Sequence, residues 1–153
     1  MQNKSRLFAT DFNAYLLAQA KNGRFPRKCL EAGRANYLHS GGPRTLDAFL
    51  AAGSHYLSVA DRLRKATLFH RHSLVDEGIF NEFQLIMCRN VLIYFNADVQ
   101  RKVLELFAHS LHRDGFLVLG PQDGIGQVAR AAGFVPYAKS QHIYRLNDGG
   151  EHV

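Results

Sequence analysis

Cysteine and long apolar runs are both scarce in this chain of 153 residues. Its two cysteines, Cys29 and Cys88, cannot build a disulfide framework and lack the spacing of a metal site, so we expect reduced thiols and no bound metal. No apolar run reaches the ~18–20 residues that cross a bilayer, and no basic-then-apolar leader opens the chain. These absences exclude a disulfide scaffold and predict a cytoplasmic protein without membrane insertion.

Acidic residues are outnumbered, since 13 Asp and Glu face 19 Lys and Arg and the formal charge is +6. Such a charge suits an acidic protein partner or nucleic acid, and it also suits a merely solvated surface. The basic residues are scattered and do not form a cluster interleaved with aromatic side chains, the arrangement that binds single strands. We therefore expect no nucleic-acid partner, and the choice between an acidic partner and a solvated surface stays open.

Short apolar runs alternate with helical patterns along most of the chain, without internal repeats. The patterns predict strands at 6–10, 66–70, 83–88 and 116–120, helices after Asn13, after Asn96 and at 125–132, and a closing hairpin from 134–138 and 142–146. Asp114-Gly115 is typical of a turn, and the stretch from Phe25 to Ala60 is too weakly patterned to assign. The alternation predicts one α/β domain with a parallel sheet flanked by helices.

The most informative stretch runs from Phe83 to Asn96, with the sequence FQLIMCRNVLIYFN. A continuous apolar run of this kind is typical of a buried parallel strand, because helices cover both faces of its sheet. Ligands of open α/β sheets bind beyond the carboxyl ends of such strands. Arg89 and Asn90 follow the run directly, so we expect them at a ligand site.

This stretch resembles the CRNVLIYF signature of CheR-type methyltransferases, which methylate receptor glutamates with S-adenosylmethionine. The resemblance extends from about residue 6 to residue 146. It implies a Rossmann-like class I methyltransferase sheet that closes with an antiparallel hairpin. It also implies protein-glutamate O-methyltransferase activity, S-adenosylmethionine as cofactor with S-adenosylhomocysteine as product, and a chemoreceptor or similar signalling protein as substrate.

Asp11 ends the first predicted strand, where an acidic residue can accept hydrogen bonds from ribose hydroxyls. The residues from Ala9 to Asn13 resemble the family's ATDI motif, which implies that Asp11 holds the ribose and that Phe12 lies beside the adenine. The alternative for Asp11 is a helix cap. Together with the distal signature, the pattern favours ribose binding.

Residues 69–76 resemble the family's F-x-x-x-N-L-L pattern, whose Asn-Leu pair contacts adenine, and the corresponding residues here are Ser73 and Leu74. Ser73 keeps a hydrogen-bonding group but lacks the two donors of an amide. His70 and His72 would share one face of a strand, yet a zinc site needs a third ligand. No candidate is near in the sequence, so we expect surface or half-buried histidines and no metal site.

The resemblance places Cys88, Arg89 and Asn90 against the methyl donor, and Arg89 and Tyr94 at the substrate pocket. A glutamate carboxyl has a pKa of about 4.3 and is ionised at neutral pH, so the enzyme has to supply placement rather than a general base. We assign Arg89 to positioning this carboxylate and Tyr94 to holding one of its oxygens. The alternatives are a structural salt bridge for Arg89 and a core position for Tyr94.

The family's first strand and glycine-rich turn are missing from the pattern, so we expect a partial methyltransferase domain over residues 1–153. Pro121-Gln122-Asp123 stands where the family has His-Ser-Glu or a similar triplet, with Asp123 as a stand-in for the acidic residue. The missing strand would lie between the strands that end at Asp11 and Cys88. Its absence leaves two unpaired edges, which can pair with a second chain to form a homodimer.

Two functions therefore compete. The signature from Cys88 to Phe95 favours the enzyme. The missing glycine-rich turn favours a non-catalytic interaction module, or a fragment that has lost cofactor binding.

Overall fold

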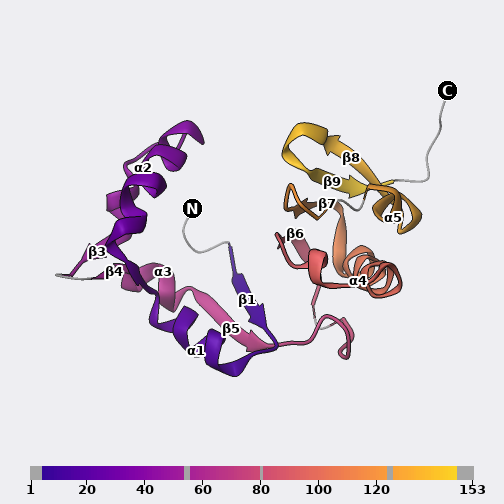
Figure 1. Ribbon diagram of the computed structural model, residues 1–153, viewed down its shortest axis with the longest axis horizontal. Coiled ribbons are helices and arrows are strands. Elements are labelled where there is room, and N and C mark those ends of the chain that lie inside the picture. The colour runs from indigo at the N-terminus through magenta and orange to yellow at the C-terminus, as the bar shows by residue number, and fades with distance from the viewer. Residues whose placement is uncertain (1–4, 54–55, 80, 124–125, 148–153) are drawn as a thin grey trace. The chain divides into compact units, whose positions relative to one another are not determined.

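The structure, a computed structural model, describes residues 5–53, 56–79, 81–123 and 126–147 (Figure 1). The chain divides into two compact units, unit 1 from Met1 to Ser73 and unit 2 from Leu74 to Val153. The strands in these residues form a two-stranded, a three-stranded and a four-stranded sheet. Parallel and antiparallel pairs both occur and helices separate many of the strands, so the predicted α/β class is confirmed.

Unit 1 contains a parallel pair of strands, β1 (Leu7–Asp11) and β5 (Thr67–Arg71), with Asp11 opposite Arg71. Helix α1 (Ala14–Asn22) follows β1. The side chain of Asn13 caps this helix by accepting two backbone N–H bonds, and Gly23 ends it in the left-handed conformation at φ +60°. Both residues satisfy backbone groups that a helix end leaves without partners, as their types predict.

An antiparallel sheet occupies the stretch that the sequence pattern leaves unassigned. Its strands are β2 (Arg24–Pro26), β3 (Leu50–Ala52) and β4 (Tyr56–Val59), in the order β2-β4-β3. Leu57 of the central strand is buried. Strands of three or four residues are too short to show a two-residue period, and β2 lies about thirty residues before its partner β4. The short helix α3 (Asp61–Lys65) leads from this sheet to β5.

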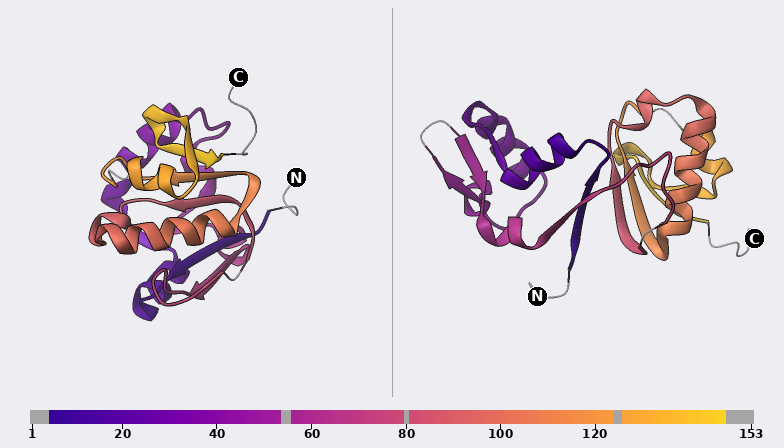
Figure 2. Two further views of the ribbon diagram at one scale, coloured as in Figure 1. Left: turned by 90° about the vertical axis from the view of Figure 1, so that its right-hand side faces the viewer. Right: turned by 90° about the horizontal axis from the view of Figure 1, so that it is seen from below.

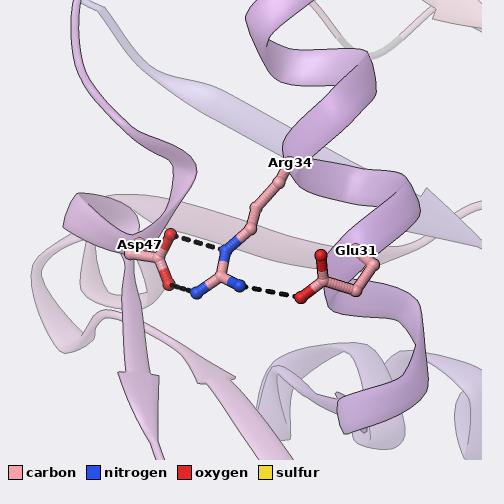
Figure 3. A network of polar contacts seen from close by, with 3 residues as sticks. All are labelled: Glu31, Arg34 and Asp47. Atoms are coloured by element: carbon pink, nitrogen blue, oxygen red, sulfur yellow. Dashed lines mark hydrogen bonds and ion pairs between the residues drawn. The ribbon is translucent and has the colours of Figure 1, made fainter.

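Charged side chains join helix α2 (Leu30–His39) to the 3-10 turn η2 (Leu46–Phe49), as Figure 3 shows. Arg34 donates to both carboxylate oxygens of Asp47, at 2.9 and 2.7 Å, and to Glu31 at 2.8 Å. The hydrogen bonds from Arg34 hold the pKa of the Asp47 carboxyl below its usual range. These groups are exposed, so water and salt weaken the pairing. Leu30 is the one residue of α2 that is buried, so apolar packing holds little of this helix. We therefore assign the network to orienting the helix.

Unit 2 is built on the sheet β6-β7-β9-β8, with the bounds β6 (Phe83–Cys88), β7 (Leu111–Leu119), β8 (Phe134–Ala138) and β9 (Ile143–Leu146). Strands β6 and β7 are parallel, and η3 (Leu92–Tyr94) and helix α4 (Ala97–Ser110) connect them. Strands β8 and β9 pair antiparallel around η4 (Lys139–Gln141). The closing hairpin and the bounds of the strand at 83–88 are therefore confirmed.

Helices α4 and α5 (Gly126–Ala131) pack against the sheet of unit 2 (Figure 2). Asn96 caps α4 by accepting the N–H of Val99 at 3.0 Å, as predicted. For α5, the first residue of the predicted range, Ile125, lies outside the described residues. The buried core comprises Cys88, Leu92, Val103, Leu104, Phe107, Leu111, Leu117, Leu119, Ala129 and Phe134. The carboxyl end of β6 is thus anchored in the core.

Two features of unit 2 differ from the expectation. Strand β7 begins at Leu111, and a bulge takes up residues 112–115, because Phe83 pairs with Leu111 and Leu85 with Phe116. The predicted Asp114-Gly115 turn is therefore part of this irregularity within a longer strand. The sheet also exposes apolar residues, since Leu85 and Met87 are 53% and 64% exposed while Cys88 is buried. A continuous apolar run does not reveal whether one or both faces are covered.

Candidate cofactor and substrate site

Asp11 lies at the carboxyl end of β1 with a half-buried side chain. Its Oδ1 accepts the backbone N–H of Asn13 at 2.8 Å, and its carbonyl oxygen accepts the N–H of His72 at 3.2 Å. Asn13, and not Asp11, is the N-cap of α1. Within the described part of the chain Oδ2 of Asp11 makes no hydrogen bond. The carboxylate thus organises its own turn through one oxygen and leaves the other without a partner in the described structure.

Phe12 presents its ring to solvent beside this carboxylate, with 69% of the residue exposed. Arg71, which ends β5, donates from Nε to the carbonyl oxygen of Phe12 at 3.0 Å. This bond ties the turn after β1 to the neighbouring strand. The sequence pattern does not single out Arg71, although its register opposite Asp11 follows once the two strands are paired.

Ser73 and Leu74 follow β5 and stand on either side of the division between the units. Ser73 is half-buried in unit 1, and Leu74 packs against the core of unit 2. The expectation of surface or half-buried histidines is wrong for His72, which is 5% exposed. Its N–H donates to the carbonyl oxygen of Asp11 and extends the pairing of the two strands by one residue. Among the described residues, no three His, Cys, Asp or Glu side chains gather where they could hold a metal ion.

In unit 2, the turn from Cys88 to Asn90 follows β6 directly. Asn90 adopts φ +58°, a left-handed conformation that Asn tolerates better than most residues. Its backbone N–H donates to Oδ2 of Asp123 at 3.1 Å, and the N–H of Gly120 donates to the same oxygen at 2.6 Å. The buried carboxylate of Asp123 therefore joins the turn after β6 to the end of β7, a role that the sequence analysis did not assign.

Arg89 and Tyr94 project from this region into solvent. Arg89 is exposed, and no hydrogen bond or ion pair of its side chain occurs within residues 5–53, 56–79, 81–123 and 126–147. Tyr94 is 80% exposed, whereas Leu92 in the same turn is fully buried. The core alternative for Tyr94 is therefore wrong, and the described residues show no structural salt bridge for Arg89. Both side chains are accessible to a ligand.

The Cys88 thiol is neutral at physiological pH. Burial raises the pKa of this thiol to about 12, and the negative charge of Asp123 adds to the effect. A nucleophilic cysteine needs a lowered pKa and some exposure. Cys88 consequently acts as a core residue that supports the turn, and not as a nucleophile.

We expect a thiol reagent at pH 8 to modify the exposed Cys29 quickly and Cys88 at least about tenfold more slowly, because only the thiolate reacts. Mass spectrometry of the alkylated peptides measures both rates. The unfolded thiol ionises at lower pH than the folded one, so the free energy of unfolding should fall as the pH rises from about 9 towards 12. Equal labelling of the two cysteines in the native protein would contradict this assignment.

Residues 1–140 match the family described as CheR methyltransferase, SAM binding domain. The chain belongs to this family. It is 38% identical over 139 residues to a protein named putative methyltransferase Cher3 from Pseudomonas putida, covering 91% of this chain and 51% of that protein. It is 33% identical over 119 residues to a chemotaxis protein methyltransferase from Listeria monocytogenes, covering 78% of this chain and 42% of that protein. The chain spans about half the length of these CheR relatives.

Solved methyltransferase structures are also similar to the chain. Magnesium protoporphyrin IX methyltransferase from Synechocystis, solved with bound SAM, aligns with a TM-score of 0.48 and 14% identity, covering 95% of this chain and 59% of that one. An S-adenosylmethionine-dependent methyltransferase from Clostridium acetobutylicum aligns with a TM-score of 0.43 and 14% identity, covering 75% of this chain and 33% of that one.

The cofactor of the CheR domain is S-adenosylmethionine, and the residues of this chain suit its chemistry. A carboxylate with one oxygen available, at Asp11, suits vicinal ribose hydroxyls. The exposed ring of Phe12 suits the face of a purine. In unit 2, Arg89 offers an accessible cation at the end of a strand.

Proposed function

We propose that the chain is part of a protein-glutamate O-methyltransferase that transfers a methyl group from S-adenosylmethionine to a chemoreceptor or similar signalling protein. The observation that carries this proposal is the anchored turn after β6, which presents Arg89 to solvent without a hydrogen-bond or ion-pair partner among the described residues. The membership of the CheR family supports it.

S-adenosylmethionine supplies a methyl group activated by its sulfonium. In unit 1 we assign cofactor binding to Asp11, Phe12 and Ser73. In unit 2 we assign it, separately, to Leu74, Cys88, Arg89 and Asn90. Arg89 also draws the substrate carboxylate into place, and the hydroxyl of Tyr94 donates to one carboxylate oxygen. Because a glutamate carboxyl has a pKa of about 4.3, the substrate is already ionised at neutral pH and needs no general base. The catalytic contribution of the protein is placement.

The test of the cofactor assignment is Asp11→Asn in the longest natural chain that contains these residues. The amide oxygen can still accept from Asn13, but the charge-assisted bonds to ribose are lost, so affinity for S-adenosylhomocysteine should fall roughly tenfold or more. Calorimetry measures the affinity, and Asp61→Asn, an exposed carboxylate in unit 1, is the control. Equal affinity for Asp11→Asn and wild type would contradict the assignment. An unaltered full-length protein that binds no cofactor would favour the non-catalytic interaction module.

The substrate is tested by transfer of a radiolabelled methyl group to a receptor signalling domain. We expect labelling of a domain with glutamates at its methylation sites and none when these are glutamine, because the amide is a poor nucleophile. Equal labelling of both domains would contradict a carboxylate substrate.

No helix in the described parts of the chain is long and apolar enough to cross a membrane. We place the protein in the cytoplasm on the strength of its proposed substrate.

We also propose that two copies associate through sheet edges. Among the described strands, β1 pairs only with β5 and β6 pairs only with β7, so each has one edge without a neighbouring strand. A strand edge with no neighbour offers backbone groups to a second chain, and the exposed Leu85 and Met87 add apolar surface on β6. Light scattering of this chain at tens of micromolar should therefore show dimers or larger species. A monodisperse monomer would contradict the proposal.

A further inference from the structure

The carboxylate of Asp123 is enclosed between the ends of β6 and β7, and the residue is 3% exposed. Its Oδ2 accepts two backbone N–H bonds, from Gly120 at 2.6 Å and from Asn90 at 3.1 Å. Its own N–H donates to the carbonyl oxygen of Gly120 at 3.2 Å, which closes a tight turn. One oxygen atom therefore holds two turns that are separated by 33 positions in the sequence.

Gly120 makes this close approach feasible. A Cβ atom at position 120 would overlap the side-chain oxygen of Asn90, and it would lie 2.7 Å from the Asn90 nitrogen and 2.8 Å from Oδ2 of Asp123. Any side chain there would push the two turns apart. The left-handed φ of Asn90 turns the chain sharply after Arg89, and the bond to Asp123 holds it in that conformation.

The second oxygen of Asp123 is buried without a hydrogen-bond partner among the described residues. Burying a carboxylate with incomplete hydrogen bonding is costly, and an apolar side chain would avoid the cost. The charge also raises the pKa of the neighbouring Cys88 thiol. A costly charge kept at this position is more readily explained by the geometry that it imposes than by stability.

We propose that Asp123 is a positioning residue, which fixes the turn from Cys88 to Asn90 and so the place from which Arg89 and Asn90 meet their ligands. The consequence for catalysis rests on the function proposed above. The fixing of the turn does not, because it concerns bonds within unit 2 alone.

Amide hydrogen exchange on the ligand-free chain tests the fixing of the turn. In Asp123→Ala, the amides of Asn90 and Gly120 should exchange roughly tenfold faster or more, because their acceptor is gone. The amide of Leu119, which bonds to the carbonyl of His142 at 3.0 Å, should be unchanged and serves as the internal reference. Asp123→Asn should restore part of the protection through its amide oxygen. The exposed Asp114→Asn is the matched control.

Gly120→Ala should also speed exchange at Asn90, because the added Cβ would overlap Asn90 and push the two turns apart. Gly78→Ala should not, because a Cβ there meets nothing within 4 Å. Equal acceleration of Leu119 and Asn90, or no acceleration at Asn90, would overturn the proposal.

In the longest natural chain, Asp123→Asn should lower kcat for methyl transfer roughly tenfold with a smaller change in KM, since placement is disturbed. An inactive wild type would contradict the proposed function, and the exchange rates would still decide the role of Asp123.

Discussion

Replacing Arg89 by alanine is expected to lower kcat/KM for methyl transfer by about a hundredfold, the typical cost of a misplaced reactant. The side chain is exposed and contacts no other residue through a hydrogen bond or ion pair in the described structure. Its removal should therefore leave the thermal stability unchanged, so that the loss reports on the reaction alone. Steady-state kinetics with radiolabelled S-adenosylmethionine, in the longest natural chain, measure the effect.

The matched control is Arg113→Ala, which removes another exposed arginine of unit 2. Within the described residues it forms a single surface ion pair, with Asp114. It should keep the activity of the wild type. Arg89→Lys keeps the charge but loses the two-pronged geometry of the guanidinium, so we expect it to recover only part of the rate. Activity of Arg89→Ala within threefold of wild type would refute the assignment of Arg89 as the residue that positions the substrate carboxylate.

Phe134→Ala is expected to destabilise unit 2 by about 3–5 kcal/mol, the usual cost of deleting a large buried ring. Phe134 is fully buried in β8 and belongs to the core that also contains Ala129 of α5 and Cys88 of β6. The ring fills the space between the sheet and its helices, and alanine would leave a cavity there. Urea denaturation, followed by circular dichroism, measures the free energy of unfolding.

The comparison for this variant is Tyr137→Ala in the same strand, since Tyr137 is 61% exposed. Its ring makes an edge contact with Phe116, with 4.9 Å between the centroids, so we expect a cost of only about 1 kcal/mol. A Phe134→Ala variant that unfolds with a free energy within about 1 kcal/mol of wild type would show that the core of unit 2 can collapse around the site.

The sequence predicted those elements whose signals lie close together in the chain. Asn13 and Gly23 bracket α1, Asn96 begins α4, and β6 has its predicted bounds. A helix cap and a helical period act over three or four residues, so a short window contains the whole signal. The CRNVLIYF signature likewise indicated the family that the match over residues 1–140 shows.

The tertiary structure decided what depends on partners far apart in the chain. The sheet β2-β4-β3 is formed by strands that are too short for a visible period, and β2 pairs with a strand about thirty residues later. The burial of His72 is likewise not visible in the sequence around it. In the sequence, Asp123 is only a stand-in within a motif. In the structure its Oδ2 accepts the N–H groups of Gly120 and Asn90, and so joins the two turns. A carboxylate acquires this role only when two strand ends meet, and the spacing of residues along one chain does not encode that meeting.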